Sequence, residues 1–169
     1  MKPGIMVPAV ALIGVMAVGC DGPQPTESLG GGPLFTTTRS AITATLGPTT
    51  VETPGRTRVS ADGIIHVRDQ TEKGLINGDI VGMVTLVTNA NVALETGDGV
   101  GFGTFVITTS EGTWEGRFQG PFDGGLGSGS FVAHGAGAFE GLILKGAFVE
   151  TGAETNTFAV TGEIIDPGS

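Results

Sequence analysis

The chain has 169 residues, of which 31 are Gly and only 15% are charged. Each Gly inside a helix costs about 0.5–1 kcal/mol relative to Ala, so this composition argues against a helical bundle. With 8 basic against 17 acidic residues, the formal net charge is −9, which argues against nucleic acid as a partner because that binding depends on clustered Lys and Arg. Hydrophobic residues make up 39% of the chain, enough for one domain with its own core.

The first twenty residues have the pattern of an export signal. Lys2 precedes an apolar run over residues 5–18, which is shorter than the roughly 20 residues of a membrane span but suits the core of a signal helix. The run ends in the letters AVGC, with Cys20 last, and this resembles the lipobox of bacterial lipoproteins. The resemblance implies that residues 1–19 are removed as a signal peptide and that Cys20 is diacylated. It also implies an anchor in a membrane of the bacterial cell envelope, with the protein facing the periplasm or the exterior. The alternative is an ordinary secretory signal with an incidental Cys.

Residues 20–37 are predicted to form a lipidated Cys followed by a flexible tether. The stretch after Cys20 reads DGPQPTESLGGGP, in which Leu29 is the only large apolar side chain. This composition cannot bury enough surface to order itself. We therefore expect the folded domain over residues 38–166.

From about residue 40 to 165, the pattern predicts strands rather than helices. Short β-branched and Phe-containing runs alternate with Gly-containing turns, and no segment shows a convincing 3.6-residue apolar period. Asn77-Gly78 is the strongest hairpin signal, because both residues accept the positive φ of a type I′ turn. The expected strands are residues 39–46, 63–75, 79–89, 100–109, 112–121, 127–135, 142–150 and 156–165. Residues 49–59 are left open as strand or loop.

Eight long strands joined by short turns predict an all-β fold, a single antiparallel up-and-down barrel of about eight strands. Closure removes exposed sheet edges, and a sandwich is the alternative. Within these strands Gly-x-Phe occurs six times, beginning at Gly103, Gly116, Gly120, Gly129, Gly137 and Gly146. The two-residue period of a strand places both members on one face, where Gly allows bending and a neighbouring aromatic ring can cover the bare backbone. We interpret the repeat as a device that builds the barrel, not as a binding motif.

Three stretches resemble the end of the allene oxide cyclase/dirigent-like barrels, especially their small bacterial members. They are GTWEGRFQG at 112–120, SFVAHGAGAFEGL at 130–142 and KGAF at 145–148. In that family the phrase G-x-G-x-F-x-G-L…G-x-F closes the barrel, and residues 135–142 fit it. The resemblance covers about residues 62–164. It implies an eight-stranded antiparallel barrel with a central cavity, often a homo-oligomer, and in some members the cyclisation or coupling of hydrophobic small molecules. The catalytic residues of the plant cyclases are not carried over, because their Tyr-containing pocket has no counterpart in a chain without Tyr.

Two polar strand faces are candidates for chemistry. His66, Arg68 and Gln70 alternate along one expected strand, and Glu115 and Arg117 along another. If either face points inward, it places ionisable groups in the barrel cavity, as acid–base catalysis requires. The alternative is that both faces point to water, with Arg and Glu in cross-strand pairs.

Other candidates have simpler explanations beside the functional ones. His134 and Glu140 could bind a ligand, but two groups are too few for a closed zinc site, and we expect no metal. Trp114, the only Trp, could line a ligand pocket or pack in the core. The Gly-rich stretches at 97–103 and 124–129 fit no phosphate-loop pattern, so we interpret them as turns and expect no cofactor.

These observations predict an envelope-anchored lipoprotein without enzymatic activity, whose barrel binds a small hydrophobic molecule inside or a protein partner outside. The alternative is a cyclase or isomerase that acts on a hydrophobic substrate in the cavity, assisted by His66, Arg68, Glu115 or Arg117. A purely structural surface protein is a third hypothesis. The enzyme hypothesis requires at least two inward ionisable groups around a cavity of about 300 Å³ or more. A barrel filled by apolar side chains would exclude both the enzyme and the small-ligand hypotheses.

Overall fold

The computed structural model describes residues 36–152 and 156–168, and this part of the chain forms ten β-strands. The strands are β1 (Thr38–Leu46), β2 (Thr50–Thr53), β3 (Arg56–Val59), β4 (Ile64–Gly78), β5 (Gly82–Ala93), β6 (Gly99–Thr108), β7 (Gly112–Asp123), β8 (Leu126–Gly137), β9 (Ile143–Gly152) and β10 (Thr157–Asp166). Within the described ranges, no helix has the length and apolar character needed to cross a membrane. The predicted signal peptide, Cys20 and most of the predicted tether lie outside the described residues.

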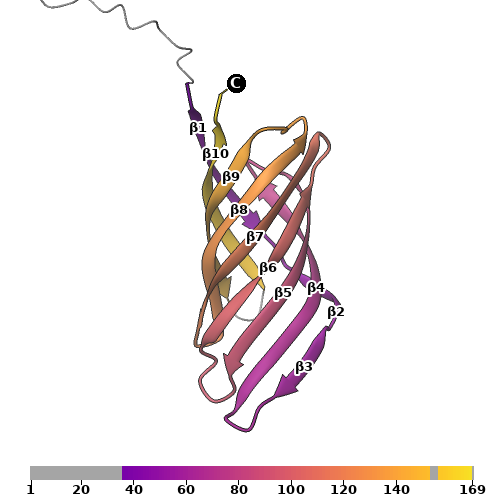
Figure 1. Cartoon of the computed structure of the whole chain (residues 1–169), viewed down its shortest axis with the longest axis vertical. Coiled ribbons are helices and arrows are strands. Elements are labelled where there is room, and N and C mark those ends of the chain that lie inside the picture. Colours follow the sequence, from indigo (N-terminus) through magenta and orange to yellow (C-terminus); the bar gives the residue numbers. More distant parts are fainter. Residues whose placement is uncertain (1–35, 153–155, 169) are drawn as a thin grey trace, which may run out of the picture. The chain divides into compact units, whose positions relative to one another are not determined.

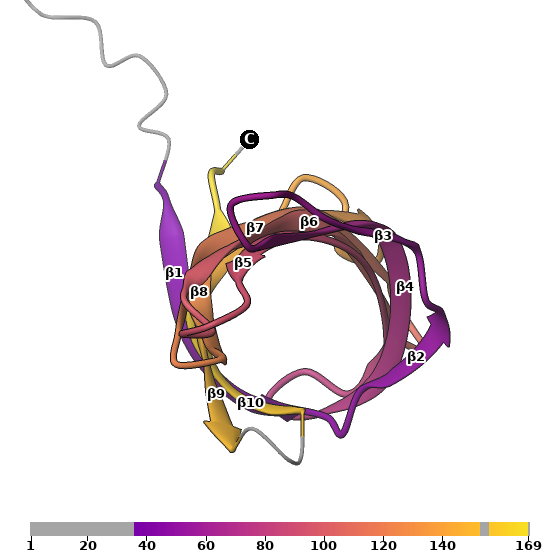
Figure 2. The ribbon, with the colours of Figure 1, turned by 90° about the horizontal axis from the view of Figure 1, so that it is seen from below.

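Eight of the strands form a closed antiparallel barrel (Figures 1 and 2). Their order is β1-β10-β9-β8-β7-β6-β5-β4, and a short β1–β4 pairing closes the ring. The predicted all-β barrel of about eight strands is therefore confirmed, with strand ends within a few residues of those expected. Residues 49–59, for which strand and loop were both left open, form two short strands, β2 and β3. Both pair with β4, nearer its start than the residues that pair with β1. Pro54 and Gly55 separate them, because Pro has no N–H for the ladder and Gly55 adopts a φ of 69°.

The predicted turn at Asn77-Gly78 is wrong by a few residues, because the chain turns after Gly78 and not at it. β4 continues through Gly78, and residues 79–81 form the connection to β5. Residues 76–78 pair with the end of β1, and this pairing keeps them in the strand. Barrel closure thus overrides the local turn preference.

Four of the six Gly-x-Phe repeats pack as predicted, with a Phe ring of a neighbouring strand over Gly103, Gly116, Gly129 and Gly146, whereas Gly120 and Gly137 lie against backbone. Phe105 lies opposite Gly116 and Phe118 lies opposite Gly103, in reciprocal pairs between β6 and β7. A Cβ on Gly116 would lie 2.7 Å from the Phe105 ring, and one on Gly103 would lie 2.8 Å from the Phe118 ring. A Phe ring of a repeat also lies against Gly101, Gly112, Gly129 and Gly146. The rings occupy the space that larger residues would fill, so a curved sheet retains a closely packed inner face.

Apolar side chains close the end of the barrel at which β7 begins, the upper end in Figure 1. Trp114, near the start of β7, is only 1% exposed and stacks on Phe139 with ring centroids 4.8 Å apart. Leu144 is also 1% exposed, and Ile80 and Ile107 belong to the same buried cluster. The core therefore fills this end of the barrel, and the interior space lies toward the other end.

Candidate functional site

A cavity of about 400 Å³ lies inside the barrel, below the Trp114 cluster. This volume falls within the roughly 300–1,000 Å³ of small-molecule pockets. Six aromatic rings dominate its wall: Phe105, Phe118, Phe122, Phe131, Phe148 and Phe158. Exposed Val51 and Gly125 also line the cavity, so it reaches solvent at the end where β7 turns into β8.

Two carboxylates belong to the cavity wall. Glu72 on β4 accepts hydrogen bonds from Gln70 Nε2 at 2.8 Å and from the hydroxyl of buried Thr49 at 3.1 Å. Glu150 on β9 accepts a hydrogen bond from the Gly127 N–H at 2.8 Å. Both glutamates are half-buried, so their charges are partly desolvated within a mostly apolar wall.

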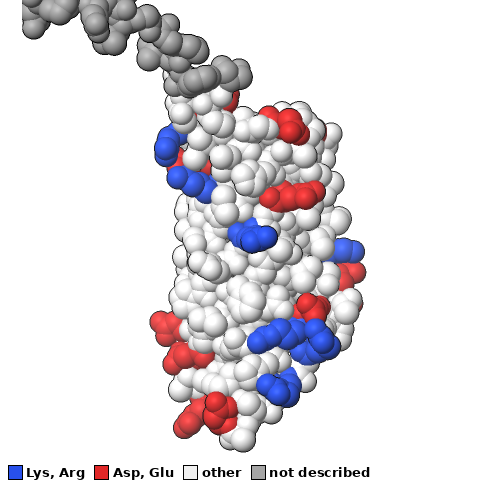
Figure 3. All heavy atoms as spheres, in the orientation of Figure 1, with Lys and Arg blue, Asp and Glu red and all other residues white. Residues whose placement is uncertain are grey.

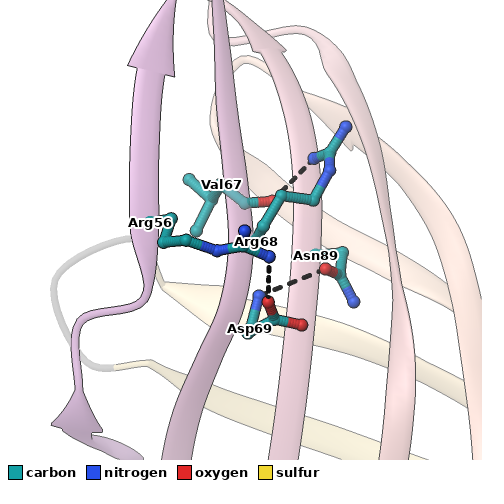
Figure 4. Close-up of polar contacts among 5 residues, drawn as sticks. All are labelled: Arg56, Val67, Arg68, Asp69 and Asn89. Carbon is teal, nitrogen blue, oxygen red and sulfur yellow. Dashed lines mark hydrogen bonds and ion pairs between the residues drawn. The ribbon is translucent and has the colours of Figure 1, made fainter.

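A β-bulge in β4 determines which residues of that strand face the cavity. Val67 pairs with Ala90 and Gln70 pairs with Thr88, so Arg68 and Asp69 together oppose the single Asn89. Asp69 adopts a left-handed φ of 59°, and its N–H donates to Asn89 Oδ1 at 3.2 Å (Figure 4). Such an extra residue bends the strand and changes the alternation of its side chains.

The bulge corrects the expectation that His66, Arg68 and Gln70 share one face. Regular alternation would place all three on the same side. The extra residue instead turns Gln70 inward, together with Glu72, and leaves His66 and Arg68 on the outer face.

The chain before β4 packs against the bulge. An Arg56–Asp69 ion pair of 2.6 Å connects β3 to it, although both side chains are mostly exposed (Figure 4). Gly55 lies even closer, since a Cβ there would be 2.5 Å from the Arg68 carbonyl oxygen and 2.7 Å from the Gln70 nitrogen. Only a residue without a side chain fits in this position, so Gly55 allows β2 and β3 to follow the bulged strand.

His66 and Arg68 form a polar group on the outside of the barrel. His66 Nδ1 lies 2.8 Å from Asn91 Oδ1, which also accepts a 2.7 Å hydrogen bond from Arg68. The guanidinium donates further to two backbone carbonyls at 2.7 and 2.8 Å and lies 6.0 Å from the ring centre of exposed Phe102. Neither residue lines the cavity. These contacts give Arg68 a structural role at the edge of the bulge.

Glu115 and Arg117 are also on the outer face. Both are exposed, and Glu115 lies opposite His134 across the β7–β8 pair. Arg117 borders a shallow outer hollow of about 1320 Å³ that follows the outside of β1 and of β5 to β10. The face drawn in Figure 3 is mostly uncharged, with basic and acidic side chains in small separate groups. The structure thus places this polar face toward water, although Glu115 and Arg117 do not lie opposite residues of the other sign on the neighbouring strands.

Trp114 and His134, the weak ligand-binding candidates, do not line the cavity. Trp114 packs in the closed end of the barrel, while His134 and Glu140 are exposed. Across the described ranges, no three His, Cys, Asp or Glu side chains come together in a group that could hold a metal ion. Within the described ranges, the ionisable side chains that line the cavity are Glu72 and Glu150, neither of which belongs to a predicted site.

Two connections border the open end of the cavity. The Asp98 carboxylate accepts the Gly124 N–H at 2.9 Å, and the Gly125 N–H donates to the Gly97 carbonyl at 3.1 Å. The hydrogen bond from Gly124 is the main reason that the pKa of Asp98 lies below its ordinary value of 3.8. The β5–β6 and β7–β8 connections are therefore held together beside the mouth.

In comparisons with known proteins, no family model matches the chain and no curated protein is significantly similar to it. The cavity and its wall are therefore the basis for a function.

Proposed function

We propose that the barrel binds a small hydrophobic molecule in its internal cavity. The observation that carries this proposal is a solvent-connected space of about 400 Å³ walled mainly by Phe rings, with a few polar side chains among them. Pockets of this kind take up ligands by burying apolar surface and orient them through a small number of hydrogen bonds.

The proposal includes the lipoprotein and family assignments made from the sequence. The chain would be a member of the allene oxide cyclase/dirigent-like barrels, anchored to an envelope membrane through Cys20. The closed eight-stranded barrel and the paired Gly and Phe residues support the family assignment. The letters AVGC ahead of an otherwise Cys-free chain support the anchor.

Dye binding tests the cavity with a matched pair of variants. Thr88 lines the cavity, so Thr88→Phe should fill part of it and weaken binding of the neutral dye N-phenyl-1-naphthylamine by about tenfold. Thr104 is exposed on the outer face of the neighbouring strand, so Thr104→Phe should leave the affinity unchanged. The measurement is a fluorescence titration of the full chain. Unchanged binding in Thr88→Phe, or weakened binding only in Thr104→Phe, would place the dye outside the barrel and contradict the proposal.

Mass spectrometry of the protein extracted from membranes tests the anchor. The expected result is a chain that starts at Cys20 and carries a diacylglycerol group. Cys20→Ser should abolish the modification and release the protein from the membrane fraction. An exported protein with an unmodified Cys20 thiol would refute this part of the proposal and leave the cavity unaffected.

The two inward carboxylates also favour a second candidate, a cyclase or isomerase acting in the same cavity. Glu72 and Glu150 could transfer protons to and from a hydrophobic substrate. In this case a molecule that co-purifies with the protein should convert to an isomer of equal mass during incubation, as followed by chromatography. Glu72→Gln or Glu150→Gln should abolish the conversion but retain the molecule. If the molecule is recovered unchanged from the wild-type protein, the result would favour a barrel that binds the molecule without converting it.

A further inference from the structure

Among the residues that the structure describes, every charged side chain in the cavity wall is acidic. Glu72 and Glu150 contribute to the wall, whereas no Lys, Arg or His among the described residues lines it. The basic side chains that form ion pairs in the described ranges pair with other acids: Arg39 and Lys145 with Glu163, Arg56 with Asp69, and Lys73 with Glu52.

The hydrogen bonds to the two glutamates come from neutral donors. Glu72 receives one from an amide and one from a hydroxyl, and Glu150 receives one from a backbone N–H. An ionised carboxylate has about four acceptor positions and no donor, so both groups retain acceptor capacity. Half-buried carboxylates without a cation are costly in an apolar wall, and a ligand that supplies the cation would reduce this cost.

The aromatic wall also favours a positively charged ligand. Phe rings attract cations through their faces, by about 0.5–1 kcal/mol at exposed sites and more where water is excluded. The rings also offer an apolar surface for the body of a ligand. An anionic ligand would find neither a cationic partner nor an attractive ring face, and it would be repelled by both carboxylates.

We propose that the ligand is a compact hydrophobic amine, whose ammonium group pairs with an inward carboxylate, Glu72 or Glu150, while its apolar body packs against the Phe rings. This inference rests on the proposed function and narrows it to one chemical class. It makes the two glutamates specificity residues, which select against the carboxylate-bearing molecules that a purely apolar cavity would accept.

Three ligands that differ only in their polar group test the inference on the full chain. They are 2-(1-naphthyl)ethylamine, 2-(1-naphthyl)ethanol and 1-naphthylacetate, titrated at pH 7 by calorimetry and in competition with the neutral dye. We expect the amine to bind about tenfold or more tightly than the alcohol, as a charge-assisted hydrogen bond implies, and the carboxylate to bind weakest. At least one of Glu72→Gln and Glu150→Gln should reduce the preference for the amine over the alcohol. Glu115→Gln, the same change on the outer face, should leave that preference intact.

The outcomes separate this inference from the proposed function. Binding of the alcohol or the carboxylate as tight as that of the amine would overturn the inference and leave a hydrophobic cavity in place. A preference for the amine that persists in both cavity variants would also overturn it, since the selecting charge would then lie elsewhere. If none of the three ligands displaces the dye, the result would count against both the amine inference and the proposed binding function.

Discussion

At the scale of single residues, the inner face of the barrel depends on pairing the smallest side chain with one of the largest. Gly129 on β8 lies opposite Phe148 on β9, and Phe131 lies opposite Gly146 two residues farther along. Each glycine lets the strand approach its neighbour closely, and each ring covers the exposed backbone that results. The cost of a side chain at such a glycine therefore depends on what already occupies the space.

Gly129→Ala should destabilise the protein. The new Cβ would overlap the Gln119 carbonyl oxygen and lie 2.8 Å from the Phe148 ring, so backbone would have to move. We expect a loss of about 1–3 kcal/mol in the free energy of unfolding, the usual cost of overpacking, measured by urea denaturation.

Gly127→Ala is the matched control, two residues away on the same strand. Its Cβ would approach nothing closer than 3.3 Å, and that neighbour is the edge of the Phe122 ring. The free energy of unfolding should change by less than about 1 kcal/mol. An equal loss in both variants would mean that strand flexibility, not the space beneath the rings, explains the glycines.

At the scale of elements, the bulge in β4 affects both the cavity and the position of β3 on the outside of the barrel. It sets the inward positions of Gln70 and Glu72, and Gly55 allows β3 to lie beside it. Gly55→Ala should displace β2 and β3, because the Cβ would contact the Arg68 and Gln70 backbone and the φ of 69° disfavours Ala. Hydrogen exchange should show lost protection in β3 and retained protection in β6 to β9.

Gly63→Ala controls for backbone strain alone. Gly63 has a φ of 79°, but its Cβ would meet nothing within 4 Å. This variant should lose about 1–2 kcal/mol from strain while β3 stays protected. Loss of β3 protection in both variants would show that close packing at Gly55 is not what positions β3.

A second prediction at this scale concerns pH and the two connections beside the cavity mouth. The pKa of Asp98 is lowered by the Gly124 N–H and then by Thr96. A carboxyl whose folded pKa is depressed stabilises the fold above its ordinary pKa of 3.8, and this contribution disappears as the pH falls through the lowered value. Asp98→Asn should therefore be less stable at neutral pH and lose less stability on acidification between about pH 6 and 2. The measurement is the free energy of unfolding as a function of pH. If it falls on acidification as much in Asp98→Asn as in the wild type, the Asp98 carboxylate does not have this role.

The sequence predicted the strands better than the faces they present. Alternation and turn residues located all eight barrel strands, because these signals are local. The bulge was not predicted. The inward apolar residues of β4 have odd numbers at Ile65 and Val67 but an even number at Ile76, and this change requires one extra residue between them. Glu150 had a simpler signal, since it follows Phe148 by two residues and must share its face. The turn after β4 could not be located locally, because its position depends on pairing with β1, more than thirty residues away.

At the scale of the whole molecule, the barrel has one weak seam. β1 pairs with β10 over nine residues but with β4 over only three. Asp79 extends this short contact, since its carboxylate accepts the Thr43 N–H at 2.7 Å and its own N–H donates to the Thr43 carbonyl at 2.9 Å. Closing the ring therefore depends on a few hydrogen bonds and on the buried side chains of Leu46 and Ile76 beside them.

Asp79→Ala should open this seam more readily than it unfolds the barrel. We expect a loss of about 1–2 kcal/mol, in the range for a hydrogen bond to a charged group. Hydrogen exchange at the Thr43 amide should accelerate by a larger factor than exchange in β7 or β8, because the affected contact joins only β1 and β4. Asp123→Ala, an exposed acid at the end of β7, should change neither quantity. If exchange instead accelerates equally in all strands of the Asp79 variant, the barrel opens only by global unfolding, and the seam is as strong as the other strand pairs.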